Sequence, residues 1–465
     1  MPAVITVEFD DGTLLLRGVP DAAELPECCV WDARVRAHRA RACDYARVLR
    51  ALHGAHEYTD TARAYAELSL QEHHAFPLRP YQQQALDAWS QAKRRGVVVL
   101  PTGAGKTYVA VKAILAVQRS ALVLAPTIDL VQQWAGELER RLAVPIGRYG
   151  GGDKDLQDIT VSTYDSGLLI MPHYGNRFGL LVCDECHHLP AEVTSQAAQA
   201  CIAPFRLGLT ATPERIDGGH AQLNDLLGAI VHRSDIVELE GEYLADYQVE
   251  VLEVPLDPDE QEAYHSNRQH YLDFIRRRGI RFDRPDGWTS FIKEAARDAE
   301  GRSVMQAYRE QKRLARASRA KLRVVWDLLR DHQGERCIVF TDDNATAYAI
   351  GSEMLLPVLT HHTKGAERKA MLDGFRSGEL PVLVTSRVLN EGVDVPDASV
   401  GIVVSGSGSV REHVQRLGRI LRRRPDKVAQ LYELIGAGTA EAYTSERRRL
   451  HSAFGEQELN FEDGG

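Results

Sequence analysis

Residues 97–107 read Val-Val-Val-Leu-Pro-Thr-Gly-Ala-Gly-Lys-Thr, an apolar run that leads into a glycine-rich loop. The residues after the loop predict a helix that begins at Lys106. Glycines let a backbone close around a phosphate, and amide groups at the start of a helix point toward it. We therefore predict a Walker-A loop for a nucleotide, formed by Thr102, Gly103, Gly105, Lys106 and Thr107. In such a loop the lysine amine reaches the β- and γ-phosphates, and the threonine hydroxyl binds Mg²⁺.

A second apolar run, residues 179–183, ends in the adjacent acids Asp184 and Glu185. Asp184 is predicted to hold Mg²⁺, and Glu185 to polarise the attacking water. An acidic pair at the end of a strand is often only a surface feature. Here the loop at Lys106 lies about eighty residues earlier and supplies the phosphate-binding half, so we expect both groups on consecutive parallel strands of one ATP-hydrolysing site.

Composition narrows the class of protein. The chain has 465 residues, a net charge of −9 and seven cysteines, an odd number that argues against a disulfide framework. No apolar run approaches the ~20 residues of a membrane span, and the first residues show no secretory signal. We predict a protein without membrane contact, cytoplasmic and nucleoid-associated in a prokaryote, or nuclear if the source is eukaryotic.

Alternating apolar runs and helical stretches predict two parallel α/β units. The expected domains are an N-terminal α+β domain at 1–75, α/β units at 76–245 and 321–440, an insert at 246–320 and a tail at 441–465. In the first domain we expect strands at 4–9 and 13–18, followed by a helix over 32–53.

The insert is basic within an acidic protein. Residues 268–323 hold 16 Lys and Arg against 7 Asp and Glu. Such a run is either a solvated helical face or a surface that follows nucleic-acid phosphates. The candidate phosphate contacts are Arg276, Arg277, Arg278, Arg281 and Arg284.

Three further signals point to nucleotide chemistry. The amide of Gln82 precedes a predicted helix and can read an adenine edge. The hydroxyls of the Thr210-Ala211-Thr212 segment suit either a hinge that hydrogen-bonds the acidic pair or the cap of a strand. Arg416, Arg419 and Arg422 fall on one predicted helical face, where a triphosphate would offset their repulsion.

Nine motifs occur in order: LRPYQ (78–82), PTGAGKT (101–107), APTIDLVQQW (125–134), STYDSG (162–167), DECHH (184–188), GLTATPER (208–215), IVFTD (338–342), SRVLNEGVDVP (386–396) and QRLGRILR (415–422). This set resembles superfamily 2 helicases from residue 78 to 436. GLTATPERIDG (208–218) and SGSGSVREHVQRLGRILR (405–422) are most similar to the XPB family. The resemblance implies two RecA-like motor domains, an N-terminal damage-recognition domain and a helical thumb at the basic insert. It also implies an ATP- and Mg²⁺-dependent 3′–5′ DNA helicase or double-strand translocase in repair, with duplex, forked or damaged DNA and a nuclease as partners.

The resemblance also implies roles for single residues. Lys106 and Thr107 bind phosphate and Mg²⁺, Asp184 binds Mg²⁺, Glu185 activates water and Gln82 contacts adenine. Arg419 and Arg422 act as arginine fingers, assisted by Gln415 and Arg416, and Gly392 and Asp394 couple nucleotide to DNA. Further implied DNA contacts are Thr127, Thr385, Arg215 and Asp217. The family's Arg-Glu-Asp triplet reads Arg215-Ile216-Asp217 here, which predicts weak strand separation.

Three alternatives stay open. Pro285-Asp286 followed by Glu310-x-Lys312 loosely fits a nuclease core, although residues 302–323 predict a helix. An ATP-gated DNA clamp without unwinding would keep every ATP residue. RNA could replace DNA, because motor motifs contact the backbone. Haem attachment at Cys183-x-x-Cys186-His187 is set aside for want of an export signal, and zinc for want of a second cysteine pair.

Overall fold

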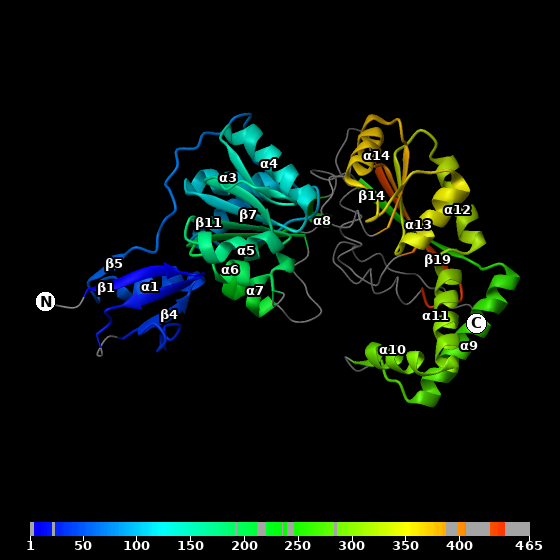
Figure 1. Ribbon diagram of the computed structural model, residues 1–465. Helices are drawn as coiled ribbons and strands as arrows, with labels where there is room; N and C mark the ends of the chain where they lie inside the picture. Colours follow the sequence, from blue (N-terminus) through cyan, green and yellow to red (C-terminus); the bar gives the residue numbers. More distant parts are fainter. Residues whose placement is uncertain are drawn as a thin grey trace. The chain divides into compact units, whose positions relative to one another are not determined.

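The structure is a computed structural model that describes residues 4–20, 24–190, 193–211, 220–234, 236–239, 246–282, 286–386, 398–405 and 428–441 (Figure 1). The chain forms two compact units that divide between residues 238 and 239.

The first unit opens with a small domain built on a five-stranded sheet. Its strands are β1 (Ile5–Asp10), β2 (Thr13–Arg17), β3 (Val30–Asp32), β4 (Ala37–Arg41) and β5 (Tyr58–Asp60), in the order β3-β4-β2-β1-β5. Asp11 and Gly12 both have positive φ, which suits the two-residue turn between β1 and β2. The 3₁₀ turn η1 (Ala42–Asp44) and helix α1 (Tyr45–Leu52) follow β4, and α1 packs Val48 and Leu52 into the core.

The predicted helix over 32–53 is wrong for its first part. Strand β4 lies between β2 and β3 and pairs antiparallel with both. Arg39 in β4 bonds to Asp10 at 3.1 Å and to Asp32 at 3.0 Å. Arg39 therefore serves cross-strand pairing here rather than a helical face. The two predicted strands that flank the turn are confirmed.

The first α/β domain has an eight-stranded sheet in the order β13-β6-β12-β11-β7-β10-β8-β9. Its strands are β6 (Arg95–Val99), β7 (Ala121–Ala125), β8 (Ile146–Gly150), β9 (Asp153–Lys154), β10 (Ile159–Thr163), β11 (Leu180–Asp184), β12 (Phe205–Thr210) and β13 (Ile230–Arg233). All pairings are parallel except β8 with β9. The central strands are buried along their whole length, as expected for a sheet covered on both faces.

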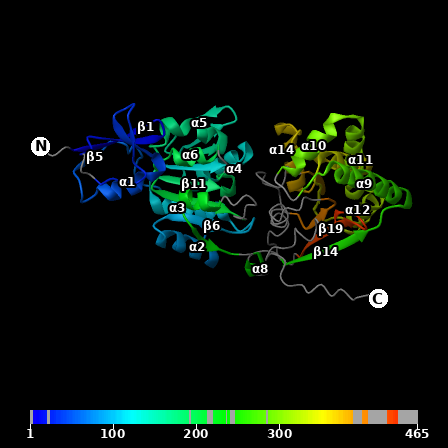
Figure 2. The same ribbon diagram turned by 90° about the horizontal axis from the view of Figure 1, so that it is seen from below.

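Helices cover both faces of this sheet. They are α2 (Pro80–Gln91), α3 (Lys106–Val117), α4 (Ile128–Leu142), α5 (Tyr164–Tyr174), α6 (Ser195–Gln199) and α7 (His220–Leu227), with the 3₁₀ turn η2 (Cys186–His188) after β11. A short helix, α8 (Ile236–Leu239), follows β13. Figure 2 shows α2 and α3 on one side and α5 and α6 on the other. The predicted parallel α/β unit is confirmed.

The small domain is joined to this α/β domain by a strap, residues 61–79, which runs along α3. Near the end of α3 the backbone of Leu68 donates to the carbonyl of Gln118 at 2.8 Å. Glu72 pairs with Lys112 in the middle of α3. Near its start the Tyr108 hydroxyl donates to the carbonyl of Phe76 at 2.6 Å. The strap therefore follows the helix that begins at the phosphate loop.

A buried arginine holds together the opposite end of the sheet. The side chain of Arg206 in β12 is fully buried, and its guanidinium donates to four backbone carbonyls. Two of these carbonyls belong to α6 and α7, and Trp89 of α2 donates to the Arg206 carbonyl at 2.8 Å. Arg206 thus holds α6 and α7 through its side chain and α2 through its backbone carbonyl.

We expect Arg206→Met to destabilise the first unit strongly. Each carbonyl that loses its donor costs about 1–3 kcal/mol, so a total of at least about 3 kcal/mol should lower the thermal midpoint by about 6 °C or more. Differential scanning calorimetry measures this shift. Arg140→Met is the matched control, because Arg140 pairs with Glu137 on the surface of α4 and should change the midpoint by no more than about 2 °C. Equal midpoints for both variants would contradict the role assigned to Arg206.

The second unit has a six-stranded parallel sheet in the order β14-β19-β18-β15-β17-β16. Its strands are β14 (Asp246–Val254), β15 (Cys337–Phe340), β16 (Val358–Leu359), β17 (Val382–Thr385), β18 (Val400–Val403) and β19 (Val428–Gly436). Helices α12 (Arg319–Asp331), α13 (Asn344–Met354) and α14 (Gly365–Ser377) connect them. The second predicted α/β unit is confirmed. Strand β14 belongs to this sheet, although residues 246–254 fall within the span predicted as insert.

The insert itself consists of helices α9 (Pro258–Arg278), α10 (Gly287–Arg297) and α11 (Ala299–Arg316). Figure 1 shows α9 and α11 side by side, with α10 across their far end. An aromatic core of Phe274 and Phe291, with Tyr271 and Tyr308 against it, joins the three helices. Nothing in the described part of the insert is a strand, so the acids of the suggested nuclease core do not lie at strand ends.

Within the described ranges, no helix is both long enough and apolar enough to span a membrane.

Candidate active site

The phosphate loop lies between β6 and α3 as predicted. Gly103 and Gly105 have φ values of +84° and +80°, a region that suits glycine. The amine of Lys106 donates to the carbonyl of Leu100 at 3.3 Å and lies 3.6 Å from Oε1 of Glu185. The lysine therefore faces the predicted acid across the loop.

Gln82 holds this loop from α2. Its Nε2 donates to the carbonyl of Ala104 at 2.9 Å, and its Oε1 accepts from the backbone of Arg79 at 3.0 Å. The hydroxyl of Tyr81 donates to the same Ala104 carbonyl at 2.8 Å. A Cβ on Gly105 would lie 2.5 Å from the Gln82 amide. The structure thus adds a loop-holding role to the adenine contact predicted for Gln82.

Asp184 ends β11 in a buried position. The indole Nε1 of Trp134 in α4 donates to its Oδ2 at 2.8 Å, and the Glu185 backbone donates to its Oδ1 at 3.0 Å. Burial, together with the charge of Glu185, raises the pKa of Asp184 to about 6. A bound divalent cation would offset the cost of two adjacent carboxylates.

Glu185 has a left-handed backbone, with φ of 46°. Its Oε2 is buried, has no hydrogen-bond partner among the described residues and lies 3.5 Å from Nδ1 of His187. The same ring nitrogen lies 3.0 Å from the hydroxyl of Thr210 at the end of β12. Thr210 was expected to bond the acids directly, whereas His187 stands between them. Sequence reasoning treated His187 only as a haem or zinc ligand, although its place two residues after Glu185 was the available signal.

The residues present fit a magnesium nucleotide. Lys106, Thr107 and Asp184 supply a cation, a hydroxyl and a carboxylate, which are the groups that phosphate and Mg²⁺ require. The buried hydroxyl of Thr102 and the Oε2 of Glu185 lack hydrogen-bond partners within the described part of the chain. These two atoms are therefore available to a ligand or to water.

The strands of this site are not adjacent, contrary to expectation. Strand β12 lies between β6 and β11 and pairs with both. Thr210 is thereby placed opposite Val99, which precedes the phosphate loop. The intermediate strand supplies the group that meets His187.

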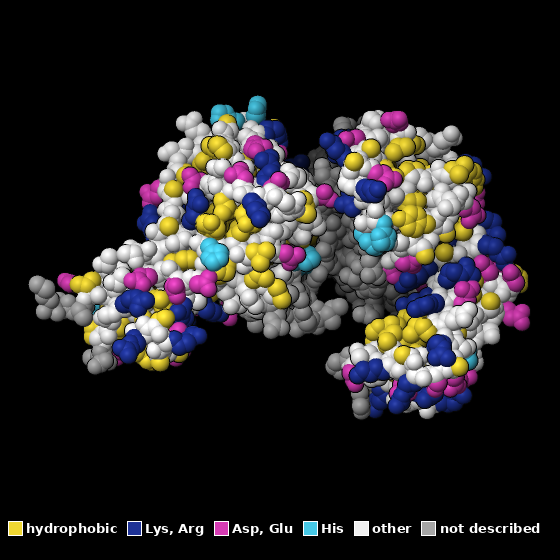
Figure 3. Space-filling view, in the orientation of Figure 1, with side chains coloured by type: hydrophobic (Ala, Val, Ile, Leu, Met, Phe, Trp, Pro, Cys, Tyr) yellow, Lys and Arg dark blue, Asp and Glu magenta, His cyan; other side chains and the backbone are white. Residues whose placement is uncertain are grey.

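The arginines predicted to follow DNA largely pair with acids of the insert. Arg277 lies 2.6 Å from Glu300, and Arg278 lies 2.7 Å from Asp298. Arg276 lies 3.6 Å from Asp273 of the same helix. Figure 3 shows basic and acidic side chains interspersed over this region. Arg281 is exposed, and Arg284 lies outside the described residues.

The two predicted threonine contacts have structural bonds in this structure. The Thr127 hydroxyl caps α4 by accepting from Leu130 at 3.3 Å. Thr385 is fully buried and donates to the carbonyl of Leu359 at 3.1 Å. The remaining predicted residues lie outside the described ranges: Arg215, Ile216, Asp217, Gly392, Asp394, Gln415, Arg416, Arg419 and Arg422.

The metal alternatives gain no support. The described residues contain no cluster of three His, Cys, Asp or Glu side chains suited to a metal. Cys183 and Cys186 are buried, which raises the pKa of both thiols.

The acids of the suggested nuclease core lie at the start of a helix or within one. Asp286 precedes α10, and Glu310 pairs with Arg313 on the surface of α11.

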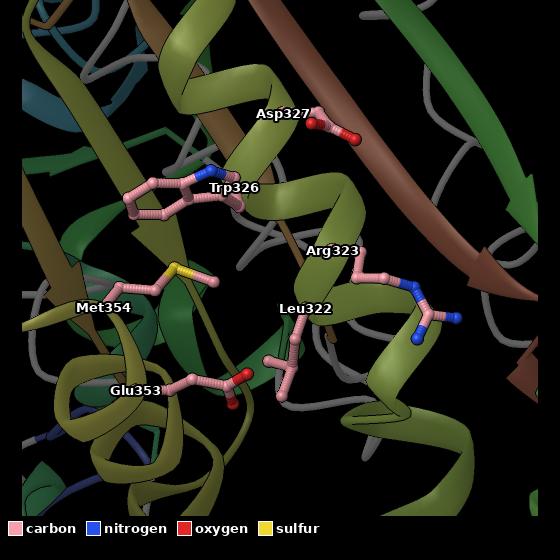
Figure 4. A pocket seen from close by; sticks show the side chains of 6 residues that line it. All are labelled: Leu322, Arg323, Trp326, Asp327, Glu353 and Met354. Atoms are coloured by element: carbon pink, nitrogen blue, oxygen red, sulfur yellow. The ribbon is translucent and has the colours of Figure 1, made fainter.

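A separate pocket of about 390 Å³ lies on the second unit, between α12 and α13 (Figure 4). Its walls are Leu322, Arg323, Trp326, Asp327, Glu353 and Met354. None of the predicted site residues lines it.

We expect Trp134→Phe to weaken Mg²⁺ binding and so to raise the Mg²⁺ concentration that catalysis requires. The phenyl ring still fills most of the space of the indole. The variant loses the N–H that orients Asp184, and loss of such a supporting bond costs about 10-fold or more in metal affinity. The measurement is the Mg²⁺ concentration that gives half-maximal ATP hydrolysis. Trp326→Phe, a change to a half-exposed indole in the other pocket, is the control. An unchanged Mg²⁺ requirement in Trp134→Phe would show that the bond does not matter.

Three family models match the chain. The damage recognition domain of the xeroderma pigmentosum group B helicase matches residues 7–62, the res subunit of type III restriction enzymes matches 75–215, and the helicase conserved C-terminal domain matches 320–424.

Two relatives and one solved structure are similar over most of the chain. The DNA 3′-5′ translocase XPB2 of Sulfurisphaera tokodaii is 44% identical over 80% of this chain and 84% of its own length. The DNA 3′-5′ helicase XPB of Kineococcus radiotolerans is 32% identical over 80% of this chain but only 62% of its own length. The crystal structure of the Pyrococcus furiosus Hef helicase domain aligns with a TM-score of 0.51 and 20% identity, covering 80% of this chain and 98% of that one. The last likeness supports the two RecA-like sheets.

Proposed function

We propose that this chain, which belongs to the XPB helicase family, is an ATP-driven motor that acts on DNA with 3′–5′ polarity. The observation that carries the proposal is the meeting of Lys106 and Glu185, 3.6 Å apart, across a phosphate loop. The names of both relatives, a DNA 3′-5′ translocase and a DNA 3′-5′ helicase, support DNA as the substrate and the polarity.

The geometry assigns each group a part in hydrolysis. The Lys106 amine, which now bonds a backbone carbonyl and faces Glu185, transfers to the terminal phosphates when nucleotide binds. Thr107 and Asp184 would hold Mg²⁺, which would supply positive charge against those phosphates. Glu185 then accepts a hydrogen bond from the attacking water through its unpartnered Oε2. His187 lies between this carboxylate and Thr210, so a change at Glu185 reaches the segment that follows β12.

We expect Glu185→Gln to bind ATP within about threefold of the wild-type affinity and to hydrolyse it about 10²-fold or more slowly. The amide keeps the shape of the carboxylate but cannot accept the proton. Lys106→Ala should instead lose nucleotide affinity. Equilibrium nucleotide binding and turnover with duplex DNA measure the two effects, with the exposed Glu353→Gln as the control. Substantial DNA-stimulated turnover in Glu185→Gln would refute the assigned role.

The residues of the second domain complete the proposed ATP site. Arg419 and Arg422 would stabilise the transition-state charge, a role worth about 10³–10⁵ in rate. Gln415 and Arg416 would assist, and Gly392 and Asp394 would couple nucleotide to DNA. The support is their place in the family motifs, since all six lie outside the described residues.

We further propose a place in DNA repair, with a nuclease as partner. The support for the repair role is the small N-terminal domain, whose sequence matches a damage recognition domain over residues 7–62. Its five-stranded sheet packs against Ile202 of the first α/β domain. A lesion bound there would therefore be held close to the motor.

A clamp that translocates without separating strands is the second candidate. Ile216 favours it, because an apolar residue replaces the central acid of the family's triplet. Such a side chain can neither repel a phosphate nor pair with an arginine.

We expect Ile216→Glu to increase the unwinding of a forked duplex while ATP hydrolysis stays within a few-fold. The restored acid would act on the DNA strands rather than on the nucleotide. Strand displacement and DNA-stimulated hydrolysis are measured on the same substrate. Leu355→Glu, at a residue 91% exposed on the second domain, controls for added charge. Brisk wild-type unwinding that Ile216→Glu does not change would remove the support for the clamp.

A further inference from the structure

The insert is anchored where its helices leave the second sheet. Leu256 and Tyr264 at the start of α9 pack against Leu314 and Ala315 at the end of α11. The Tyr264 hydroxyl accepts a hydrogen bond from the backbone of Ala440, just beyond β19, at 3.0 Å. The base of the insert therefore contacts the sheet through packed and bonded groups.

Arg316, the last residue of α11, forms a forked ion pair at this base. Its guanidinium bonds to Asp342 and, at 3.1 Å, to Asp343, the two acids that follow β15. The Asp342 side chain is only 3% exposed. Its backbone donates to the Ser405 hydroxyl at 3.0 Å, which ties the ends of β15 and β18 together. The fork thus reaches two loops at the carboxyl edge of the sheet.

Burial of the carboxylate distinguishes this pair from the neighbouring ion pair of the same helix. Arg313, one turn earlier on α11, pairs at 2.7 Å with Glu310 of the same helix, and both side chains are well exposed. Exposed pairs of that kind contribute little, whereas a nearly buried carboxylate that loses its cation is left uncompensated. The Arg316 fork should accordingly contribute more to the structure than the exposed pair of Arg313.

The insert is also long. Helix α11 has 18 residues and extends about 27 Å. At the far end, Phe282 and Trp288 are each 46% exposed. Any rotation at the base would therefore be amplified at these aromatic side chains.

We propose that Arg316 is a positioning residue that fixes the insert to the carboxyl edge of the second sheet, so that the second domain and the insert move as one body on DNA. This inference rests on the proposed motor function. With the fork intact, the far end of α11 moves as far as the second domain carries it. Without it, ATP is still hydrolysed, but part of the movement is lost at the joint.

The test compares Arg316→Ala, Arg316→Lys and the matched control Arg313→Ala in the full-length protein. ATP hydrolysis and displacement of a triplex-forming strand are measured on the same duplex, and the ratio gives translocation per ATP. We expect Arg316→Ala to keep hydrolysis and the KM for ATP within about twofold, while the ratio falls about fivefold or more. Arg316→Lys, which can meet one carboxylate but not both, should be intermediate, and Arg313→Ala should match the wild type.

A second variant and a second measurement guard against misfolding. Asp343→Asn keeps an N-cap for α13 but loses half of the fork, so its ratio should fall less than that of Arg316→Ala. Spin labels at Arg302→Cys in α11 and Ser352→Cys in α13, with Cys28 and Cys29 replaced by serine, should give a narrow distance distribution that Arg316→Ala broadens. If Arg316→Ala changed neither the translocation per ATP nor the distribution of label distances, the positioning role of Arg316 would be refuted. A wild-type protein that neither hydrolyses ATP on DNA nor displaces the strand would overturn the motor function instead, while the label distances still decide the joint.

Discussion

The parallel pairing of β6, β12 and β11 is the constraint on which the nucleotide chemistry depends. Because the carboxyl ends of parallel strands meet at one edge, the loop at Lys106, the acid Glu185 and the hydroxyl of Thr210 converge from distant parts of the sequence. The intermediate strand is as important as the outer two. It places Thr210 against His187, so the acid is connected to the segment that leads away from the site.

Charged side chains fulfil two different tasks in this molecule. Arg206 and Lys321 are buried, Arg316 is partly buried, and all three connect separate elements. The fully buried Lys321, for example, bonds the carbonyl of Val404 at 2.9 Å and the carboxylate of Glu441. The arginines of the insert's outer surface mostly pair with neighbouring acids. A positive charge sum therefore indicates less about nucleic-acid binding than the number of cations left without acidic neighbours.

Local patterns carried the predictions that succeeded. The glycine-rich loop follows one apolar strand, and the two acids follow another. In each case the residues that do the chemistry are adjacent in the sequence, so the pattern alone predicts their function. Trp134 and Arg316 could not be assigned in this way, since each acts on a carboxylate supplied by a distant element. His187 lies only two residues after Glu185, but its contact with Thr210 depends on the pairing of β11 with β12. The segment 32–44 was misread because its arginines and alanines fit a helix equally well, and only pairing with β2 and β3 makes it a strand.

Strand β14 has a consequence for how the protein is made. Within the sheet its neighbour is β19, and their register joins Asp246 to Val428 and Val254 to Gly436. A ribosome therefore releases β14 and the entire insert long before the strand that receives them exists. During that interval the insert can form its own three-helix core, but its base cannot yet pack against the completed sheet. Premature termination anywhere before residue 428 would leave β14 without its partner strand, and the chain would be a substrate for chaperones and proteases rather than a partly active motor.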